Sequence, residues 1–559
     1  MPLQTEHVVQ RNEARRLIDQ KIVMHERSIL PLKFQRNEVA SVSRLPPEVL
    51  GPIFAFASAA SAVRYRPSSS FNFSHVCRLW RNVALTTPGI WCFISLHYQQ
   101  WATAMLERSK LADLVLDLNF ATATSSTLTH EQFLKNVLDN HTSRIRELSL
   151  KGFSSSTLLD SLEDLQPSSL RLRSLQLVDL DAHRTPSFPI GIIANSEGLL
   201  DLDVVGCNIA WCSMPLTGLT SLKMDSNPTR PLWLDFITVL GGMPSLATLE
   251  IRDSLPMAVE LRQRTSNPVR LTKLRRLDLG SKRDITEVLN VLSSIVVPQA
   301  ASIKISGGTK ATPNISLSLV SEFASSLSAF ISEMISEHNH PMFYRELKVN
   351  SPYGQLALKA RRGVCKSDRI RRTSSPDLDL SLSGLPYSAK KILPEFTKRL
   401  PLSKLKSLDL TGAVRKAAVL LECFGDLQKL RSVTLKGSVI RGFLQMLMVK
   451  AKGRDGKLTC PALQYLEILN PVFSPGHADG FSFEELTDCL MERCNHSAEL
   501  RKLILSACTN LYAEDVALLQ EIVVDVDWDQ YYSEDEDEDE DDEDPYSFHH
   551  CHCYLYNLT

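Results

Sequence analysis

A short apolar pattern, Leu-x-x-Leu-x-Leu, recurs along the middle and C-terminal parts of the chain. Its clearest copies begin at Ile145, Leu172, Leu199, Leu219, Leu246, Leu274, Leu405, Leu430, Leu463 and Leu500. The first five intervals between these starts are 27, 27, 20, 27 and 28 residues. Because alternate residues share one face of a strand, each copy predicts a short strand with an apolar face.

Helix-like segments lie between the copies, for example at residues 235–243 and 417–427. One such unit cannot bury its apolar side alone, so neighbouring units must stack. We therefore expect an α/β fold over residues 91–530: a curved solenoid with a parallel sheet on the concave face and helices on the convex face. Residues 112–120 should form the first full repeat strand. A long α/β sheet that is not a solenoid is the alternative.

The rhythm breaks between residues 306 and 400, and only weak copies, near Ala301 and Arg345, lie between the clear copies at Leu274 and Leu405. Within this break, "KARRGVCKSDRIRRTSSP" at residues 359–376 is basic, polar and rich in turn formers. We interpret it as part of an exposed insertion near 350–377. A nuclear import signal or a basophilic kinase site at Ser374 is the alternative. Asn is mostly missing from the usual turn position of the repeats, so we expect uneven loops.

Residues 1–40 are polar and helix-prone. Ile18, Ile22, His25, Ile29 and Leu32 follow a 4-3-4-3 spacing, which places them on one stripe of a helix. Pro31 should kink or split this helix. The first interpretation is a helix that lies on its own domain, and a short dimerising coiled coil is the alternative.

Residues 43–90 combine two helical patterns around a loop at residues 66–72. Pro46 and Pro47 suit the start of a helix, and Glu48 suits its positive end. The first helix carries Val49, Leu50, Ile53, Phe54 and Phe56, and the second carries Val76, Cys77, Trp80, Val83 and Ala84. So small a module cannot bury all this apolar surface, so some should remain for a partner or for the following domain. An ordinary helical cap on the repeat domain is the alternative.

Residues 44–85 resemble the F-box, with Leu-Pro-x-Glu-Val-Leu and Ile-Phe followed by Val-Cys-Arg-x-Trp-Arg and Ala. The matching residues are Leu45, Pro46, Glu48, Val49, Leu50, Ile53, Phe54, Val76, Cys77, Arg78, Trp80, Arg81 and Ala84. The layout also resembles fungal F-box-like proteins with irregular leucine-rich repeats. The spacer at residues 55–75 departs from the family, because it lacks the Leu-x-x-Leu pattern of the middle helix of the box.

This resemblance implies a substrate-recognition subunit of an SCF-type ubiquitin ligase, which performs no bond chemistry itself. The partners would be a Skp-family adaptor, through it a cullin, and an unidentified target protein, with one copy of the chain per complex. The implied adaptor-binding residues are Leu45, Pro46, Glu48, Val49, Leu50, Ile53, Phe54, Val76, Cys77 and Trp80. A leucine-rich scaffold whose F-box-like segment no longer docks the adaptor is the alternative function.

The charge distribution changes this picture little. The net charge is −2, but eleven carboxylates run without a break from Glu534 to Asp544. Without them, 53 acidic residues face 62 basic ones, a balance of about +9 that does not by itself indicate nucleic acid. We expect the tail at residues 531–559 to be disordered by self-repulsion and to act as a solubilising segment. Docking to a basic partner, or to the chain's own basic insertion, is the alternative.

The cysteines and the apolar segments bear on the compartment. Twelve cysteines are scattered without regular pairing, and apolar residues make up 43% of the chain, enough for a sizeable core. The first sixteen residues contain no apolar signal core, and no stretch reaches the ~18 apolar residues of a membrane helix. We therefore expect reduced thiols in a cytoplasmic or nuclear protein without membrane contact.

Motifs that carry chemistry are mostly missing. The sequence contains no phosphate-binding loop, no Gly-x-Gly-x-x-Gly, no His-Glu-x-x-His and no Gly-x-Ser-x-Gly. Cys489, Cys494 and His496 cluster in sequence, but helical spacing turns the two thiols away from each other. His549, His550, Cys551, His552 and Cys553 are packed too closely to share one tetrahedral ion. We expect no catalytic residues, no cofactor and no metal.

Overall fold

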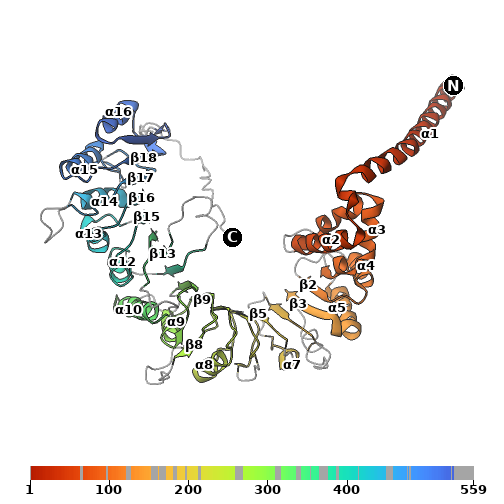
Figure 1. Cartoon of the computed structure of the whole chain (residues 1–559), viewed down its shortest axis with the longest axis horizontal. Helices are drawn as coiled ribbons and strands as arrows, with labels where there is room; N and C mark the ends of the chain where they lie inside the picture. Colours follow the sequence, from red (N-terminus) through yellow and green to blue (C-terminus); the bar gives the residue numbers. More distant parts are fainter. Residues whose placement is uncertain are drawn as a thin grey trace. The chain divides into compact units, whose positions relative to one another are not determined.

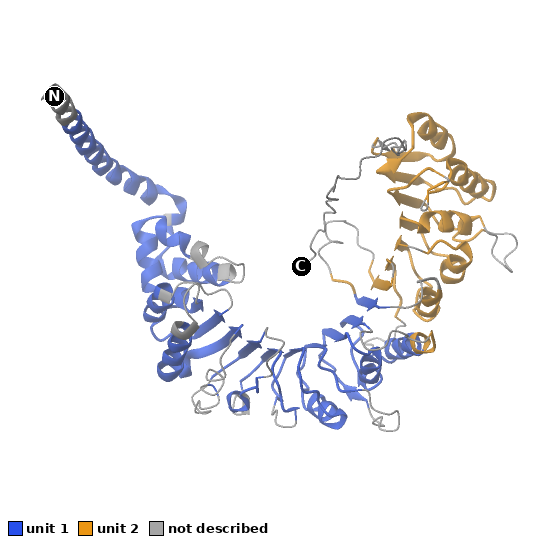
Figure 2. Cartoon of the chain, turned by 180° about the vertical axis from the view of Figure 1, so that it is seen from behind, with its two compact units in different colours: residues 1–315, 322–341, 377–384 blue, residues 316–321, 342–376, 385–559 orange. Residues whose placement is uncertain are grey.

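The computed structural model divides into two compact units, which Figure 2 distinguishes by colour. Unit 1 contains residues 1–315, 322–341 and 377–384, and unit 2 contains residues 316–321, 342–376 and 385–559. The structure describes residues 2–62, 67–95, 99–120, 127–152, 162, 171–179, 186–194, 198–211, 216–257, 268–308, 317–334, 342–352, 354–363, 375–384, 389–412, 414–448, 458–474, 476–477, 480–530 and 532–533. Both units are mixed α/β bodies.

Unit 1 begins with helices and continues with strands that alternate with helices (Figure 1). Its helical segments are α1 (Pro2–Val39), η1 (Ser41–Arg44), α2 (Pro47–Ala62), η2 (Pro67–His75), α3 (Arg78–Thr86), η3 (Pro88–Trp91), α4 (Gln99–Ser109), α5 (Thr127–His141), η4 (Thr142–Arg144), α7 (Ile190–Ala194), α8 (Trp233–Gly241) and α9 (Ile285–Leu292). The helix α10 (Leu317–Glu333) contains residues of both units.

The main strands of unit 1 pair in parallel, each with the next in the following list. They are β1 (Phe93–Ser95), β2 (Leu114–Asn119), β3 (Ile145–Lys151), β4 (Ser174–Val178), β5 (Asp201–Val205), β6 (Ser221–Asp225), β7 (Thr248–Arg252), β9 (Arg276–Ser281), β11 (Ser302–Gly307) and β14 (Leu378–Ser383). The short strands β8 (Val269–Arg270) and β10 (Ile295–Val296) form a separate parallel pair.

Two rows of apolar side chains cross these strands at consecutive register positions. The first, which we call the leucine row, contains Leu116, Leu148, Leu175, Leu202, Leu222, Leu249, Leu277, Ile303 and Leu378, all at most 3% exposed. The second row lies two residues further along each strand. Burying one such side chain contributes roughly 1.5–3 kcal/mol, so the repeated leucines explain why strands form here. The strands predicted from the repeated pattern in unit 1 are confirmed.

The helices of unit 1 lie along one face of the parallel strands, where α7, α8 and α9 follow each other (Figure 1). The buried side chains of α8 include Trp233, Phe236 and Leu240, which are at most 8% exposed. Parallel strands joined by crossover helices place such helices over the apolar face. The helix predicted at residues 235–243 is confirmed as α8.

A left-handed residue follows several of the repeat strands. Gly206 after β5, Ser226 after β6 and Asp253 after β7 have φ values of +73°, +54° and +51°. At Gly206 a side chain is excluded as well, because a Cβ would lie 2.6 Å from the carbonyl oxygen of Asp179. The chain thus leaves these three strands through the same left-handed backbone conformation.

Small buried side chains recur three residues after the last apolar residue of several strands. In this chain the position is held by Cys207, Asn227, Ser254 and Cys508, all at most 4% exposed. The Ser254 hydroxyl accepts a hydrogen bond of 2.8 Å from the backbone N–H of Asn227, which ties two successive turns together. A small buried side chain at this position thus recurs in both units.

The strands of unit 2 are also mostly parallel. They are β12 (Glu346–Ser351), β13 (Gln355–Arg361), β15 (Ser407–Gly412), β16 (Ser432–Lys436), β17 (Tyr465–Leu469), β18 (Lys502–Ser506) and β20 (Asp525–Trp528), with a small pair of β19 (Cys508–Thr509) and β21 (Tyr532–Ser533). Parallel pairing runs from β12 through β15, β16, β17 and β18 to β20, and β13 pairs antiparallel with β12. The remaining predicted strands are confirmed here.

The helices of unit 2 pack side by side in chain order (Figure 1). They are α12 (Ala389–Thr397), α13 (Ala417–Phe424), α14 (Val439–Leu447), α15 (Phe483–Asn495) and α16 (Ala513–Ile522). The helix predicted at residues 417–427 is confirmed as α13.

The break in the repeat rhythm corresponds to an excursion of the chain. Residues 342–376 belong to unit 2, the chain returns to unit 1 with β14, and unit 2 resumes at residue 385. The excursion contains the antiparallel hairpin of β12 and β13, so the segment interpreted as an insertion includes a regular strand up to Arg361. Residues 364–374, with Ser374, and the acidic tail from Glu534 onward lie outside the described residues.

The helix α1 differs from its prediction in two ways. It continues through Pro31 without a break, so the expected division at this residue is not observed. Every described side chain from Arg11 to Arg36 is exposed, so the interpretation of a helix lying on its own domain is wrong. The physical reason is that the chain turns through η1 after α1, and α2 packs on α3 and η3 instead.

Candidate functional site

The N-terminal module, residues 43–90, is built around α2. Pro47 is the first residue of this helix, where the missing N–H of proline costs nothing. Glu48 lies in the first turn, where its carboxylate interacts favourably with the helix dipole. The local sequence thus fixes where α2 begins and leaves Pro46 exposed just before it.

Two stripes run along α2 on different sides of the helix. Leu50, Phe54 and Ser58 are at most 3% exposed and face the interior of the module. Val49, Ile53 and Phe56, which we call the exposed apolar stripe, are 42%, 47% and 78% exposed. Successive residues are about 100° apart around a helix, so these three side chains lie within about 60° of one another. The helix therefore presents apolar side chains to solvent as well as to its own core.

Aromatic contacts bring the two halves of the module together. The Phe54 ring stacks on Phe73 at a centroid distance of 4.6 Å and lies 5.0 Å from the Trp80 ring of α3. Cys77 caps α3, because its Sγ accepts a 3.5 Å hydrogen bond from the backbone N–H of Trp80. The two sequence segments that resemble the F-box are thus joined in one small core.

The core of the module continues into the first strand–helix unit. Trp91 is 2% exposed, and its Nε1–H donates a 2.8 Å hydrogen bond to the carbonyl oxygen of Ala84. The Phe71 ring stacks on Trp91 at 4.9 Å, and the Arg108 guanidinium of α4 lies 4.6 Å from the Trp91 ring centroid. The interior of the module is therefore closed without the exposed apolar stripe.

The predicted adaptor-binding residues fall into three groups. Pro46, Glu48, Val49, Ile53 and Val76 are exposed, and Leu45, Cys77 and Trp80 are half-buried. Leu50 and Phe54 are 1% and 3% exposed and belong to the core of the module, where the Phe54 ring contacts Phe73 of η2 and Trp80 of α3.

Three exposed apolar residues of the module were not among the predicted site residues. Phe56 is 78%, Leu79 is 38% and Leu85 is 39% exposed. The 49-53-56 spacing was the sequence signal for Phe56. No periodic signal marked Leu79, which lies between the half-buried cap residue Cys77 and the half-buried Trp80.

A second candidate surface lies on the opposite face of the strands of unit 1. Between the two apolar rows, alternate side chains point away from the helices. This polar row contains Asp117, Ser149, Gln176, Asp203, Lys223, Glu250, Asp278, Lys304 and Asp379. Gln176 Nε2 donates to Asp203 Oδ2 at 2.7 Å, and its Oε1 lies 2.8 Å from the Ser149 hydroxyl. The row offers ordered donors and acceptors suited to another polypeptide.

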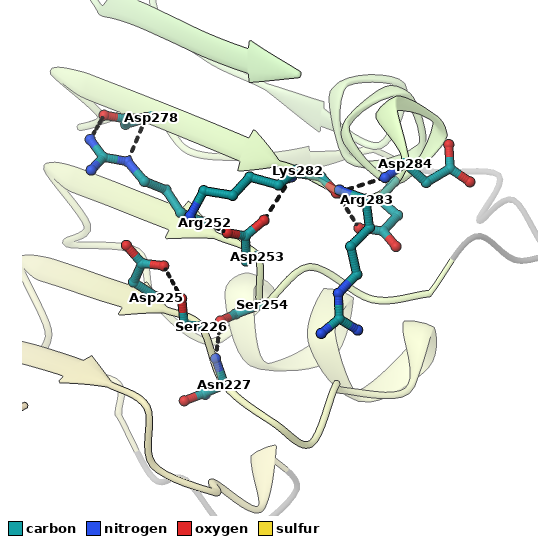
Figure 3. Close-up of polar contacts among 12 residues, drawn as sticks. Asp225, Ser226, Asn227, Arg252, Asp253, Ser254, Asp278, Lys282, Arg283 and Asp284 are labelled. Carbon is teal, nitrogen blue, oxygen red and sulfur yellow. Dashed lines mark hydrogen bonds and ion pairs between the residues drawn. The ribbon is translucent and has the colours of Figure 1, made fainter. Parts of the chain in front are cut away.

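Charged side chains gather where β6, β7 and β9 end (Figure 3). The Asp278 carboxylate is completely buried and receives Arg252 Nη2 at 2.5 Å, with Lys304 Nζ at 3.7 Å. The hydrogen bond to Asp278 raises the pKa of Arg252. Beside this pair, Lys282 Nζ lies 2.9 Å from Asp253, and this hydrogen bond raises the pKa of Lys282. These charges are paired with one another, which is typical of a structural brace.

A buried ion pair holds α9 in the same region. The Arg230 guanidinium binds the carboxylate of Glu287, and both side chains are at most 10% exposed. The Ser281 hydroxyl at the end of β9 donates to Glu287 at 2.8 Å and accepts from the backbone N–H of Asp284 at 3.1 Å. Removing either partner of such a pair leaves an uncompensated buried charge. The arrangement fixes the strand end to the helix and exposes no reactive group.

The cysteines are arranged for packing. Burial raises the pKa of the thiols of Cys207, Cys423, Cys460, Cys489 and Cys508 to about 12, which keeps them neutral and unreactive. The Cys489 thiol donates a hydrogen bond to the carbonyl oxygen of Leu444, whereas Nδ1 of His496 lies 3.0 Å from the carbonyl oxygen of Glu492. The two side chains therefore interact with different parts of the backbone. Within the described ranges, no group of three or more His, Cys, Asp or Glu could hold a metal ion.

Among the described residues, no helix combines the length and apolar character needed to cross a bilayer. No protein-family model matches the chain, and no curated protein matches it significantly.

Proposed function

We propose that this protein is the substrate-recognition subunit of an SCF-type ubiquitin ligase. In this proposal the N-terminal module is an F-box-like domain that docks a Skp-family adaptor, which links it to a cullin. The repeated strands and helices form a leucine-rich-repeat solenoid that holds the target protein.

The observation that carries the proposal is the exposed apolar stripe of α2. Val49, Ile53 and Phe56 stay accessible although the core of the module is complete, with Phe54 and Trp91 at most 3% exposed. Full burial of an exposed apolar side chain contributes roughly 1.5–3 kcal/mol, and a partner would supply about half of this at Val49 and Ile53 and most of it at Phe56. That is enough to change a dissociation constant by several powers of ten.

The polar row of unit 1 is the surface we assign to the target. The described thiols with raised pKa values are neutral, and the charges near Asp278 are paired, so the described residues suggest binding without bond chemistry. A subunit that holds its target beside a charged conjugating enzyme accelerates transfer by raising the effective concentration. Recognition alone is therefore sufficient for the proposed role.

The test is capture of a purified Skp-family adaptor by the full chain, measured by surface plasmon resonance. We expect the wild type to bind and Ile53→Asp to lose binding, because the carboxylate would be buried against an apolar surface. The double variant Leu45→Ala with Pro46→Ala tests the residues just before the helix and should also lose binding. Leu234→Asp is the matched control, since Leu234 is 68% exposed on α8 of the repeat body.

Circular dichroism of each variant separates lost docking from lost folding. Adaptor binding that survives Ile53→Asp would remove the exposed apolar stripe from the interface. A folded wild type that does not bind the adaptor at all would instead favour a leucine-rich scaffold with a module that no longer docks.

A further inference from the structure

The helix α1 exposes an apolar seam over two heptads. Ile18, Ile22, Ile29 and Leu32 are 58%, 49%, 45% and 63% exposed, although they lie on one stripe with His25. Helices in proteins are stabilised mainly by packing an apolar face, so a 38-residue helix that buries none of this stripe has an unmet packing requirement. The helix extends away from the module within unit 1 (Figure 1).

The residue types along the seam fit a two-stranded parallel coiled coil. The 4-3-4-3 spacing assigns Ile22 and Ile29 to the a positions and Ile18, His25 and Leu32 to the d positions. β-Branched residues at a with leucine at d favour two parallel strands, a rule that Ile22, Ile29 and Leu32 follow and that Ile18 and His25 do not. Pro31 falls at a c position, which faces away from such a partner.

The flanking charges identify the partner as a second copy of the same helix. Lys21 occupies the g position and Glu26 the following e position. In a parallel, in-register pair, a g residue lies beside the e residue five positions later on the other strand. Lys21 of each copy would then meet Glu26 of the other, giving two ion pairs by symmetry.

Within one chain these two residues cannot pair with each other. Five residues correspond to about 500° of helix, which leaves their side chains about 140° apart. Neither Lys21 nor Glu26 forms an ion pair with another residue of the described chain, so both charges are available to a second copy.

We propose that α1 associates with α1 of a second copy as a parallel, in-register coiled coil. Each assembly would then carry two N-terminal modules and two repeat bodies, in place of the single copy expected from the sequence. Arg15 and Arg36 occupy the a positions at the two ends of the seam, which limits the coil to about two heptads. The dimer is accordingly weak and concentration-dependent, and His25 at its centre lowers its stability further.

Sedimentation equilibrium of the full chain over a concentration series tests this inference. We expect a reversible monomer–dimer equilibrium for the wild type. Lys21→Glu places like charges together twice and should raise the dimer dissociation constant at least about tenfold. Ile22→Asn should abolish the dimer, and His25→Leu should tighten it.

Charge exchange makes the test specific for the parallel register. The double variant Lys21→Glu with Glu26→Lys restores both ion pairs and should dimerise like the wild type. An equimolar mixture of Lys21→Glu and Glu26→Lys chains should form heterodimers while each alone is mainly monomeric. Gln20→Glu introduces a carboxylate at the adjacent f position, outside the seam, and should change nothing.

A monomeric wild type at every concentration would overturn the proposal, and so would a dimer that Lys21→Glu does not weaken. A dimer that the double charge exchange fails to restore would overturn the parallel register. These results are independent of adaptor capture, because Lys21 lies outside the N-terminal module, and Lys21→Glu chains should bind the adaptor normally.

Discussion

The helices α2 and α14 are both rich in apolar residues, but they bury these residues to different extents. In α14 the large apolar side chains are Val439, Ile440, Phe443, Leu444, Met446 and Leu447, and all are at most 3% exposed. In α2, Leu50 and Phe54 are buried to the same extent, whereas the exposed apolar stripe is not. The difference arises because α14 is flanked by α13 and α15, and α2 packs on the module from one side. The helix α2 therefore keeps apolar surface that the fold of its module does not bury.

The largest effect should separate two neighbouring residues of α2. Phe54→Ala removes a ring that contacts Phe73 and Trp80, so we expect a loss of about 3–5 kcal/mol in the free energy of unfolding of the module. Urea unfolding followed by tryptophan fluorescence measures this loss.

The matched control is Phe56→Ala, which should change the stability by less than about 0.5 kcal/mol because Phe56 is 78% exposed. Equal losses for the two variants would show that the stripe is not separate from the core.

The repeat body should respond to a truncation in the leucine row almost as strongly. Leu249 lies between Leu222 and Leu277 in register and is completely buried, so Leu249→Ala should cost about 2–5 kcal/mol. Thermal unfolding monitored by circular dichroism reports the change. Thr248→Ala, on the opposite face of the same strand, is the control, and a shift as large as that of Leu249→Ala would contradict the assignment of faces.

The repeat strands could be predicted from the sequence because one residue type at a fixed spacing has one physical consequence. Leu249 and Ile251, which are two positions apart, can be buried together only on one face of a strand. The division of α2 into buried and exposed residues could not be predicted in the same way. The helix is apolar on several sides, and the spacing does not reveal which stripe packs inward. That ambiguity placed Leu50 and Phe54 among the contact residues, although the structure buries them.

Other features depend on neighbours that are distant in the sequence. The return of the chain to unit 1 at β14 depends on pairing with β11, more than seventy residues earlier, and no local pattern encodes such a pairing. Cys207 and Cys508 can be recognised as equivalent positions only when the repeat copies are aligned beyond the strand and into the following turn. The exposure of α1 likewise depends on where α2 packs, not on the stripe itself.

An intermediate effect concerns alkaline pH and the buried thiols of the repeat body. Burial raises the pKa of Cys207 from 9.0 to about 12, so the folded chain keeps this proton between these pH values while the unfolded chain loses it. Unfolding therefore becomes more favourable as pH rises above 9, by up to about 1.4 kcal/mol per pH unit for each such thiol. Between pH 8 and pH ~10, the urea midpoint should therefore fall less for Cys207→Ala than for the wild type. Identical pH dependence would contradict the assigned burial.

The smallest effect should come from the ion pair beside the polar row that joins the exposed Lys282 to the mostly buried side chain of Asp253. Lys282 is 67% exposed in its side chain, so removing its partner charge by Asp253→Asn should cost only about 0.2–1 kcal/mol. Asn tolerates the φ of +51° at this position and can still accept the hydrogen bond from the backbone N–H of Lys282, so only the charge is tested. Thermal midpoints at low and high salt should differ for the wild type and hardly for the variant. A loss as large as that of Leu249→Ala would contradict the view that the repeat body is stabilised mainly by its buried leucine row. The comparison of α2 with α14, which rests on buried apolar surface, would then lose its basis.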